Sequence, residues 1–247
     1  MRPRLQVVAA LVLASACGGG AAADGGRTTV TVLAASSLTT AAEDIMAAYR
    51  GDHPDVRLRF SLAGSQELAS QVRQGVPADV IVTADEPTMQ DQGDAVRKPV
   101  IVATNQLAIV VAAGNPKGID ALDDLARSDV VTVLAAPSVP VGRYARTVLD
   151  SAGVEVTARS EEPDVKAVLT RVRLGDADAG IVYVTDIAAA EDDVDGVEIP
   201  ADVNVVARYP AAVIADTQHE AEATDFVDWL ASTAGQDVLA KSGFARP

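Results

Sequence analysis

The chain has 247 residues and a formal net charge of −15, because 35 Asp and Glu outnumber 20 Lys and Arg. This acidic balance argues against nucleic acid as a partner, since phosphate binding needs clustered basic side chains. A single Cys excludes a disulfide framework within one chain and a multi-thiolate zinc site, and the presence of only two His argues against a His-rich metal site.

The N-terminal segment is typical of a secretion signal. Residues 1–16 begin with the charged MRPR and continue with the apolar LQVVAALVLASA, which is too short to span a membrane. Cys17 follows at once, and LASAC is similar to the lipobox of bacterial lipoproteins, in which the Cys becomes the lipidated N-terminus. The alternative is an ordinary secretory signal with an incidental Cys. We therefore predict a signal peptide over 1–16, a lipidated Cys and a flexible tether over 17–27, and an extracytoplasmic protein anchored to the cell membrane.

Strands and helices alternate along the rest of the chain. Apolar runs predict strands over residues 28–35, 78–85, 106–113, 130–136 and 179–186, and alternating apolar and polar residues predict a strand with one wetter face over 56–63. Apolar residues at helical spacing predict helices near residues 38–49, 68–72, 143–152, 163–173 and 226–230, with a last short one around 238. Pro163 is expected at the first position of its helix, and Gly153 and Gly175 just beyond the ends of two helices. The alternation predicts α/β layers with parallel sheets.

Motifs for catalysis are absent from the sequence. It contains no G-x-S-x-G, G-x-G-x-x-G or P-loop pattern, and neither His53 nor His219 has a nearby Ser or Cys in a nucleophile setting. The acidic residues Asp192, Asp193 and Asp195 lack the Gly and Glu spacing of a calcium loop, so we expect a solvated loop there. The sequence therefore indicates a protein that is not an enzyme. Hydrolysis by a pair of the many carboxylates stays open as an alternative.

Four strand-to-helix junctions carry small or hydroxylated residues where the helix begins. The junctions are AASSL with Ser36 and Ser37, AGSQEL with Gly64 and Ser65, VPVGRYAR with Val141 and Gly142, and EPDVKAVL. A helix N-terminus presents unpaired backbone N–H groups and a partial positive charge, so it holds an anion without a basic side chain. Because Ser is also a common N-cap, one such junction alone has little value as a sign of a ligand. Four such junctions in this order are a stronger indication of a ligand site.

The same segments carry a resemblance to a known family. They are VLAASSLTTAAEDI, LAGSQELASQVRQGVPADVIVTAD, NQLAIVVAAGNP, VPVGRYARTVL, EPDVKAVLTRVRLGDADAGIVYVTD and FVDWLASTAGQDVLAKSGF, within Val30 to about Phe244. The chain resembles the periplasmic molybdate-binding proteins of ABC importers, and the pair VPxGRYA and GIVYxxD is the most specific part of the match. The resemblance implies an α/β fold of the two-lobed periplasmic-binding-protein type (type II), with parallel-rich sheets flanked by helices and two crossover segments.

The resemblance also implies where the lobes divide. Lobe one is expected over 28–107 plus 211–247 and lobe two over 108–210, with crossings near Ala108 and Tyr209. The ligand would bind in the cleft, at the carboxyl ends of the strands, and closure would bring both lobes onto it.

The family's binding residues can be placed on this sequence one by one. In the family, Ser hydroxyls, a Tyr hydroxyl and backbone N–H groups hold a tetrahedral oxyanion through its oxygens, with no direct ligand to the metal. The matching positions are Ser37, Ser65, Val141, Val165 and Tyr183. The doubled serine leaves Ser36 open as the alternative to Ser37. No cofactor is expected beyond the ligand itself, molybdate or tungstate.

Charged residues near these positions affect what the site can bind. Gln66 and Glu67 replace the small residues usual in the family, which puts a carboxylate close to the anion unless Glu67 points into solvent. Arg143 and Lys166 lie at the starts of two helices, and we expect both to be solvent-exposed, because first-turn side chains point away from the axial N–H groups. The expected site is therefore a cage of neutral donors.

The implied function is transport. The resemblance implies a monomer that captures molybdate, and also tungstate, and delivers it to an ABC transporter permease and its ATPase, with the membrane contacted only through the lipid anchor. A binding protein for sulfate or another tetrahedral oxyanion is the nearer alternative, and an extracytoplasmic hydrolase or transferase on the same fold the more distant one. Phosphate is disfavoured, because a site of donors alone offers no acceptor for its proton.

Overall fold

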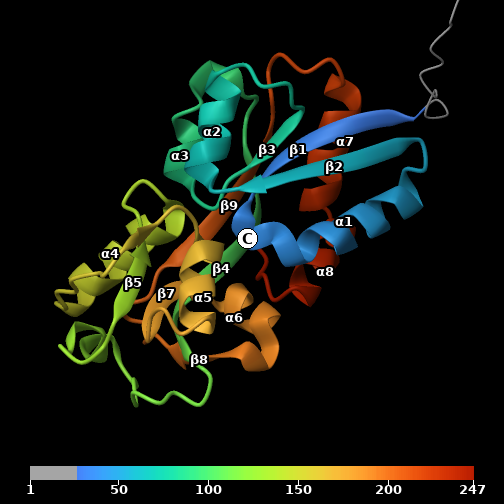
Figure 1. The fold of residues 1–247 in the computed structure, drawn as a ribbon. Helices are drawn as coiled ribbons and strands as arrows, with labels where there is room; N and C mark the ends of the chain where they lie inside the picture. Colours follow the sequence, from blue (N-terminus) through green and yellow to red (C-terminus); the bar gives the residue numbers. More distant parts are fainter. Residues whose placement is uncertain (1–26) are drawn as a thin grey trace, which may run out of the picture.

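The structure is a computed structural model that describes residues 27–247, apart from the side chain of Glu191 (Figure 1). The predictions for the signal peptide, for Cys17 and for most of the tether lie outside the described residues. Within residues 27–247, no helix combines the length and the apolar character that crossing a membrane requires.

Strands and helices alternate as the sequence predicts. The strands are β1 (Thr28–Ala35), β2 (Val56–Ala63), β3 (Val80–Val82), β4 (Val100–Ala112), β5 (Thr132–Ala135), β6 (Glu161–Glu162), β7 (Ala179–Tyr183), β8 (Val194–Glu198) and β9 (Val206–Val213). The α-helices are α1 (Thr39–Asp52), α2 (Ser65–Arg73), α3 (Glu86–Gln90), α4 (Pro140–Ala152), α5 (Val165–Arg173), α6 (Val184–Ala190), α7 (Glu220–Ala231) and α8 (Thr233–Lys241). The 3₁₀ turns are η1 (Ser36–Leu38), η2 (Gly93–Ala95), η3 (Leu122–Ala126) and η4 (Glu191–Asp193).

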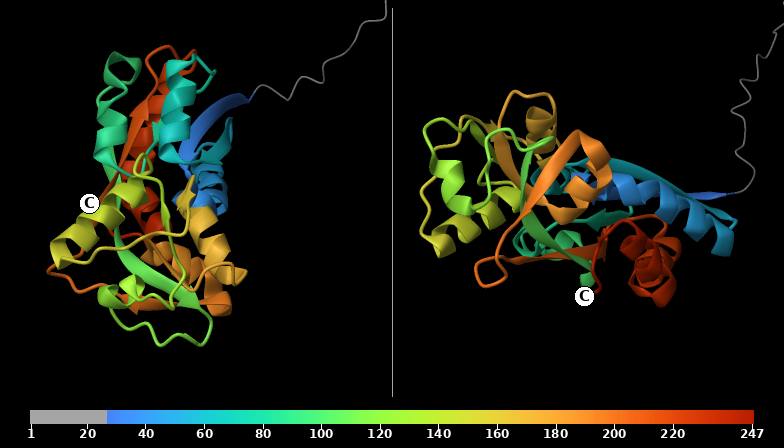
Figure 2. Two further views of the ribbon diagram at one scale, coloured as in Figure 1. Left: turned by 60° about the vertical axis from the view of Figure 1, so that its left-hand side comes forward. Right: turned by 90° about the horizontal axis from the view of Figure 1, so that it is seen from below.

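Two long strands connect the two lobes. The strand order is β2-β1-β3-β9-β4-β7-β5-β6, and β8 also pairs with β4. The first part of β4 pairs with β9 over Val100–Gln106, and the rest pairs with β7 over Leu107–Val111, so one strand serves both lobes. The pairings within each lobe that do not involve β4 or β9 are parallel, and those of β4 and β9 are antiparallel. Figures 1 and 2 show β4 and β9 running from one lobe to the other, which confirms the two-lobed α/β fold with two crossover segments.

The second half of β1, over Val32–Ala35, is apolar because helices cover both faces of the sheet there. On β1, Leu33 packs in one cluster with Leu68 of α2 and Met89 of α3. Its neighbours Val32 and Ala34 point to the opposite face, into the cluster that α1 and α7 complete. This alternation explains why the run shows no polar face in the sequence. The helices thereby hold the carboxyl end of β1, where η1 begins, in a fixed position.

Three strands, β3, β5 and β7, are shorter than predicted, and β3 and β7 each end near an Asp that caps the next turn. β3 covers only Val80–Val82, and Asp85 then accepts a hydrogen bond from Thr88 N at 3.2 Å as the N-cap of α3. β7 ends at Tyr183, whose N–H donates to Asp186 Oδ2 at 3.2 Å, and α6 follows directly. Each carboxylate accepts a hydrogen bond from a backbone N–H near the end of a strand. These bonds stabilise the start of the helix that follows.

In lobe two, the predictions for the ends of the helices are confirmed with one exception. The prediction that Pro163 occupies the first helical position is wrong, because Asp164 is the N-cap of α5 and accepts from Ala167 N at 2.9 Å. Gly153 and Gly175 lie just beyond two helices with φ of 70° and 76°. Both angles fall in the left-handed region that glycine adopts without strain, so this prediction is confirmed.

The acidic run of lobe two is not a solvated loop throughout. Val194–Glu198 form β8, which pairs with β4 in an antiparallel ladder, and Asp195 Oδ2 accepts from Gly114 N at 2.7 Å. The loop prediction is therefore wrong for Asp195. Asp192 and Asp193 lie in the turn η4 and are exposed.

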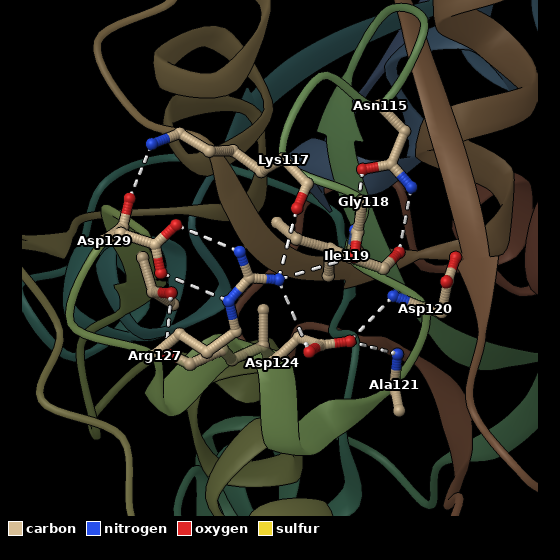
Figure 3. Close-up of polar contacts among 11 residues, drawn as sticks. Asn115, Lys117, Gly118, Ile119, Asp120, Ala121, Asp124, Arg127 and Asp129 are labelled. Atoms are coloured by element: carbon tan, nitrogen blue, oxygen red, sulfur yellow. Dashed lines mark hydrogen bonds and ion pairs between the residues drawn. The ribbon is translucent and has the colours of Figure 1, made fainter.

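Arg127 holds the loop that follows β4 (Figure 3). Its guanidinium donates to Lys117 O at 3.1 Å and pairs with Asp129 at 3.0 Å and with Asp124 at 3.5 Å. Asp124 in turn accepts from the backbone N–H of Asp120 at 2.9 Å. All these groups lie between β4 and β5, so Arg127 orders one loop and takes no part in joining the lobes.

Candidate functional site

A small cavity lies where the two lobes meet. Its lining comprises Ala35, Ser36, Ser37, Gly64, Ser65, Ala84, Val139, Pro140, Val141, Asp164, Val165 and Tyr183. The five expected site residues are all among them, and all five are buried. The cavity volume is about 10 Å³, near the space of a single water, so the lobes are close together here. A larger open hollow, about 440 Å³ in volume, lies between α1 and β2 and includes none of these residues.

Lobe one contributes serine hydroxyls from the two junctions that the sequence singles out. Ser37 lies in η1, directly after β1, and its Oγ is 3.0 Å from the hydroxyl of Tyr209. Ser65 is the first residue of α2, and its Oγ accepts from Ala84 N at 3.0 Å. Ser36 also lines the cavity, so the choice between it and Ser37 as a ligand stays a prediction.

Lobe two contributes the N-termini of α4 and α5. The first N–H groups of a helix have no partner within the helix, and they carry its partial positive charge. Val141 follows Pro140, which has no N–H of its own and fits the first helical position. Val165 follows the N-cap Asp164, whose carboxylate already accepts from the helix backbone. The backbones of Val141 and Val165 thus bring two helix N-termini to one cavity.

Tyr183 contributes a buried donor. It is the last residue of β7, 1% exposed, and its hydroxyl has no hydrogen-bond partner among residues 27–247. Burial raises the pKa of this hydroxyl well above its usual value, with smaller contributions from Tyr209 and Tyr144, so it keeps its proton. Leaving a buried donor unsatisfied costs about 1–3 kcal/mol. An anion oxygen in the cavity would satisfy it.

The expectation that Arg143 and Lys166 are solvent-exposed is wrong. The Arg143 side chain is 34% exposed, and its Nε donates to Asp85 Oδ2 at 2.9 Å. Lys166 Nζ lies 2.8 Å from Asp186 Oδ1. Both carboxylates are almost fully buried, and a buried carboxylate requires a partner of opposite charge. Both basic groups are therefore paired with buried carboxylates, and neither lines the cavity.

Arg143 and Gln66 each make a contact from one lobe to the other. Arg143 of α4 bonds both Asp85 and Thr88 Oγ1, which lie at the start of α3. Gln66 Nε2 of α2 donates to Pro163 O, just before α5, at 2.8 Å. The substitution of Gln for a small residue thus adds a bridge across the cleft. Its neighbour Glu67 is exposed, so the carboxylate does not face the cavity.

We expect Arg143→Gln to weaken anion binding about fivefold, or about 1 kcal/mol, which is less than the loss of a donor inside the cage. The reason is that the ion pair with Asp85 joins the lobes but does not touch the cavity contents. The measurement is a calorimetric titration at fixed ionic strength. Arg127→Gln is the matched control, because Arg127 also pairs with carboxylates but within one lobe, and its affinity should equal that of the wild type.

The two-lobed fold and the cavity between its lobes define a solute-binding protein. Among the described residues, no group of three or more His, Cys, Asp or Glu is placed to hold a metal ion. A sequence profile described as bacterial extracellular solute-binding protein matches residues 30–245, and the chain belongs to this family.

Proteins similar to this chain include binding proteins for molybdate and for sulfate. The molybdate-binding protein ModA of Mycobacterium tuberculosis (strain ATCC 25618 / H37Rv) is 40% identical over 202 residues, which cover 81% of this chain and 77% of the relative. The structure of the Azotobacter vinelandii periplasmic molybdate-binding protein is similar with a TM-score of 0.76 and 20% identity, over 88% of this chain and 99% of that one. The sulfate-binding protein SubI of M. tuberculosis is also similar, with a TM-score of 0.79 and 22% identity over 89% and 87%. At these identities the two structures show the shared fold alone.

Proposed function

We propose that this protein captures molybdate, and also tungstate, in the cavity between its lobes. The observation that carries the proposal is the buried Tyr183 hydroxyl, which has no partner among residues 27–247 and shares one cavity with the Ser37 and Ser65 hydroxyls and two helix N-termini. All of these groups are neutral donors, which suit a fully deprotonated oxyanion. The 40% identity to a protein named as molybdate-binding supports the same anion.

In the proposed function, the protein delivers its ligand to a transporter and catalyses no reaction. It works outside the cytoplasmic membrane as a monomer and hands the anion to an ABC transporter permease with its ATPase. The proposed division is lobe one over 28–107 plus 211–247 and lobe two over 108–210. The change of partner along β4, from β9 up to Gln106 to β7 from Leu107, supports this boundary.

The proposed function is tested by titrating the protein with molybdate, tungstate, sulfate and phosphate. We expect molybdate and tungstate to bind at least ~10-fold more tightly than sulfate, a difference of ~1.4 kcal/mol. Sulfate has shorter bonds, so it cannot reach donors on both lobes at once, and each stretched charge-assisted hydrogen bond is weaker. Sulfate binding as tight as molybdate binding would contradict the assignment and favour the sulfate alternative.

We further propose that Cys17 carries a lipid, because the apolar signal segment ends at this residue. Cys17→Ser is expected to yield a protein without lipid, either released or retained by its uncleaved signal. An acyl chain contributes about 0.8 kcal/mol of membrane affinity per buried CH₂. Labelling of growing cells with a clickable fatty acid checks this, and a wild-type protein that takes up no label would refute the anchor.

A further inference from the structure

Behind Ser37 lies a second hydroxyl that does not reach the cavity. Tyr209 of β9 is fully buried, and its hydroxyl oxygen lies 3.0 Å from Ser37 Oγ. The Tyr209 ring meets Tyr183 and Phe244 edge to face, with ring centroids 5.9 and 5.3 Å apart. Since Tyr209 does not line the cavity, these contacts hold its hydroxyl behind the serine and not beside the ligand.

A serine can bind an anion only as a donor. Its hydroxyl has one proton and two acceptor lone pairs, so once the proton points to the anion, the oxygen can only accept within the protein. Tyr209 is the group at Ser37 Oγ that could donate to it. A hydrogen bond from Tyr209 to Ser37 and one from Ser37 to the anion would form a chain, in which each bond strengthens the next.

Ser65 shows the same arrangement with a backbone donor. Its Oγ accepts from Ala84 N at 3.0 Å, in a fully buried contact. The Ser65 oxygen is thereby engaged from behind, and its proton is left for the cavity. The hydroxyls of Ser37 and Ser65 thus each have a polar group behind them, but only the one behind Ser37 belongs to a side chain that substitution can remove.

Tyr209 is suited to be the donor of the pair. Burial raises the pKa of its hydroxyl far above the usual value, although hydrogen bonds with Ser37 and Asn105 lower it. The hydroxyl therefore keeps its proton at neutral pH. Its strand, β9, is also one of the two that cross between the lobes.

We propose that Tyr209 is a positioning residue of the anion site, which donates to Ser37 Oγ and so directs the Ser37 proton to the bound oxyanion. The inference rests on the proposed function, because it assigns Ser37 as a donor to molybdate. Tyr209 itself does not touch the anion, so it acts only through Ser37.

The test is a pair of double-mutant cycles measured by calorimetric titration with sodium molybdate. Tyr209→Phe removes one oxygen and keeps the ring, and it should weaken binding about fivefold to tenfold. Ser37→Ala should weaken binding at least tenfold, and the double variant should bind within about twofold of Ser37→Ala alone. When Tyr209→Phe is combined with Ser65→Ala, by contrast, the losses of affinity of the two single variants should multiply, because Ser65 has its own backbone donor.

Tyr49→Phe is the matched control, because Tyr49 is also fully buried but lies on α1, beside Phe226 of α7 and away from the cavity. It should bind molybdate as the wild type does. Wild-type affinity in Tyr209→Phe would overturn the inference. It would also be overturned if the losses of affinity from Tyr209→Phe and Ser37→Ala multiplied in the double variant, because a general structural effect of Tyr209→Phe would multiply with both serine substitutions. A wild-type protein that does not bind molybdate would overturn the proposed function itself.

Discussion

Tyr183→Phe is expected to weaken molybdate binding at least tenfold and to leave the fold intact. A hydrogen bond to a charged group contributes about 1.5–3 kcal/mol, which corresponds to a loss of roughly 10- to 150-fold in affinity. The hydroxyl is unpartnered within the described chain, so its removal breaks no bond of the folded protein. The ring contact with Tyr209 is kept, and the melting temperature should not fall. Calorimetric titration and thermal unfolding of the same sample check both parts.

Tyr49→Phe again serves as the control, since the Tyr49 hydroxyl is likewise buried and without a partner in the described residues. The two variants make the same chemical change, and only Tyr183 lines the cavity. Equal affinities for both would refute a donor role for Tyr183. A larger loss in Arg143→Gln than in Tyr183→Phe would indicate an anion site that depends on a basic side chain.

Much of the candidate site could be predicted because its groups lie at strand-to-helix junctions. The end of β1 and the start of α2 follow from local patterns of apolar and small residues, and these place Ser37 and Ser65. The resemblance to the molybdate-binding family then adds Tyr183 and brings the junctions to one cleft. The strand over 28–35 has the predicted bounds, since it is apolar and ends at a pair of serines.

The partners of the charged residues could not be predicted in this way. Arg143 and its partner Asp85 are 58 positions apart and lie in different lobes, so no local pattern connects them. The expectation of exposure followed from the geometry of a single helix, which ignores the buried carboxylate across the cleft. Asp85 and Asp186 both follow apolar strands, and this position is a signal that each carboxylate is buried and needs a partner.

The first part of β4 was missed for a related reason. The strand was predicted from residue 106 but begins at Val100. Thr104 and Asn105 interrupt the apolar run, yet both are buried, because their polar groups are satisfied from elsewhere. Thr104 N donates to Ala245 O at 2.8 Å, and Asn105 Nδ2 donates to Thr185 Oγ1 at 2.8 Å. A polar residue in a buried strand is therefore explained only by the tertiary fold.

Gly142→Ala is expected to weaken molybdate binding at least tenfold and to lower the melting temperature. A Cβ at residue 142 would lie 2.1 Å from Ala136 O and 2.5 Å from Ala135 O, both backbone atoms that cannot turn aside. Helix α4 would have to move away from β5, and the N–H groups near Val141 would leave their place beside the cavity. Overpacking of this kind costs about 1–3 kcal/mol, and each kcal/mol lowers the melting temperature of a chain this size by about 2–4 °C.

Gly235→Ala separates the loss of the site from the loss of stability. Its Cβ would lie 2.4 Å from Trp229 O and 2.6 Å from Leu230 Cα, so the strain is similar, but α8 lies in lobe one and contributes nothing to the cavity. We expect Gly235→Ala to melt at a lower temperature and yet to bind molybdate as the wild type does. If Gly142→Ala also kept wild-type affinity, the N-terminus of α4 would not hold the anion. The close packing of Gly142 against the end of β5 would then serve the stability of lobe two alone.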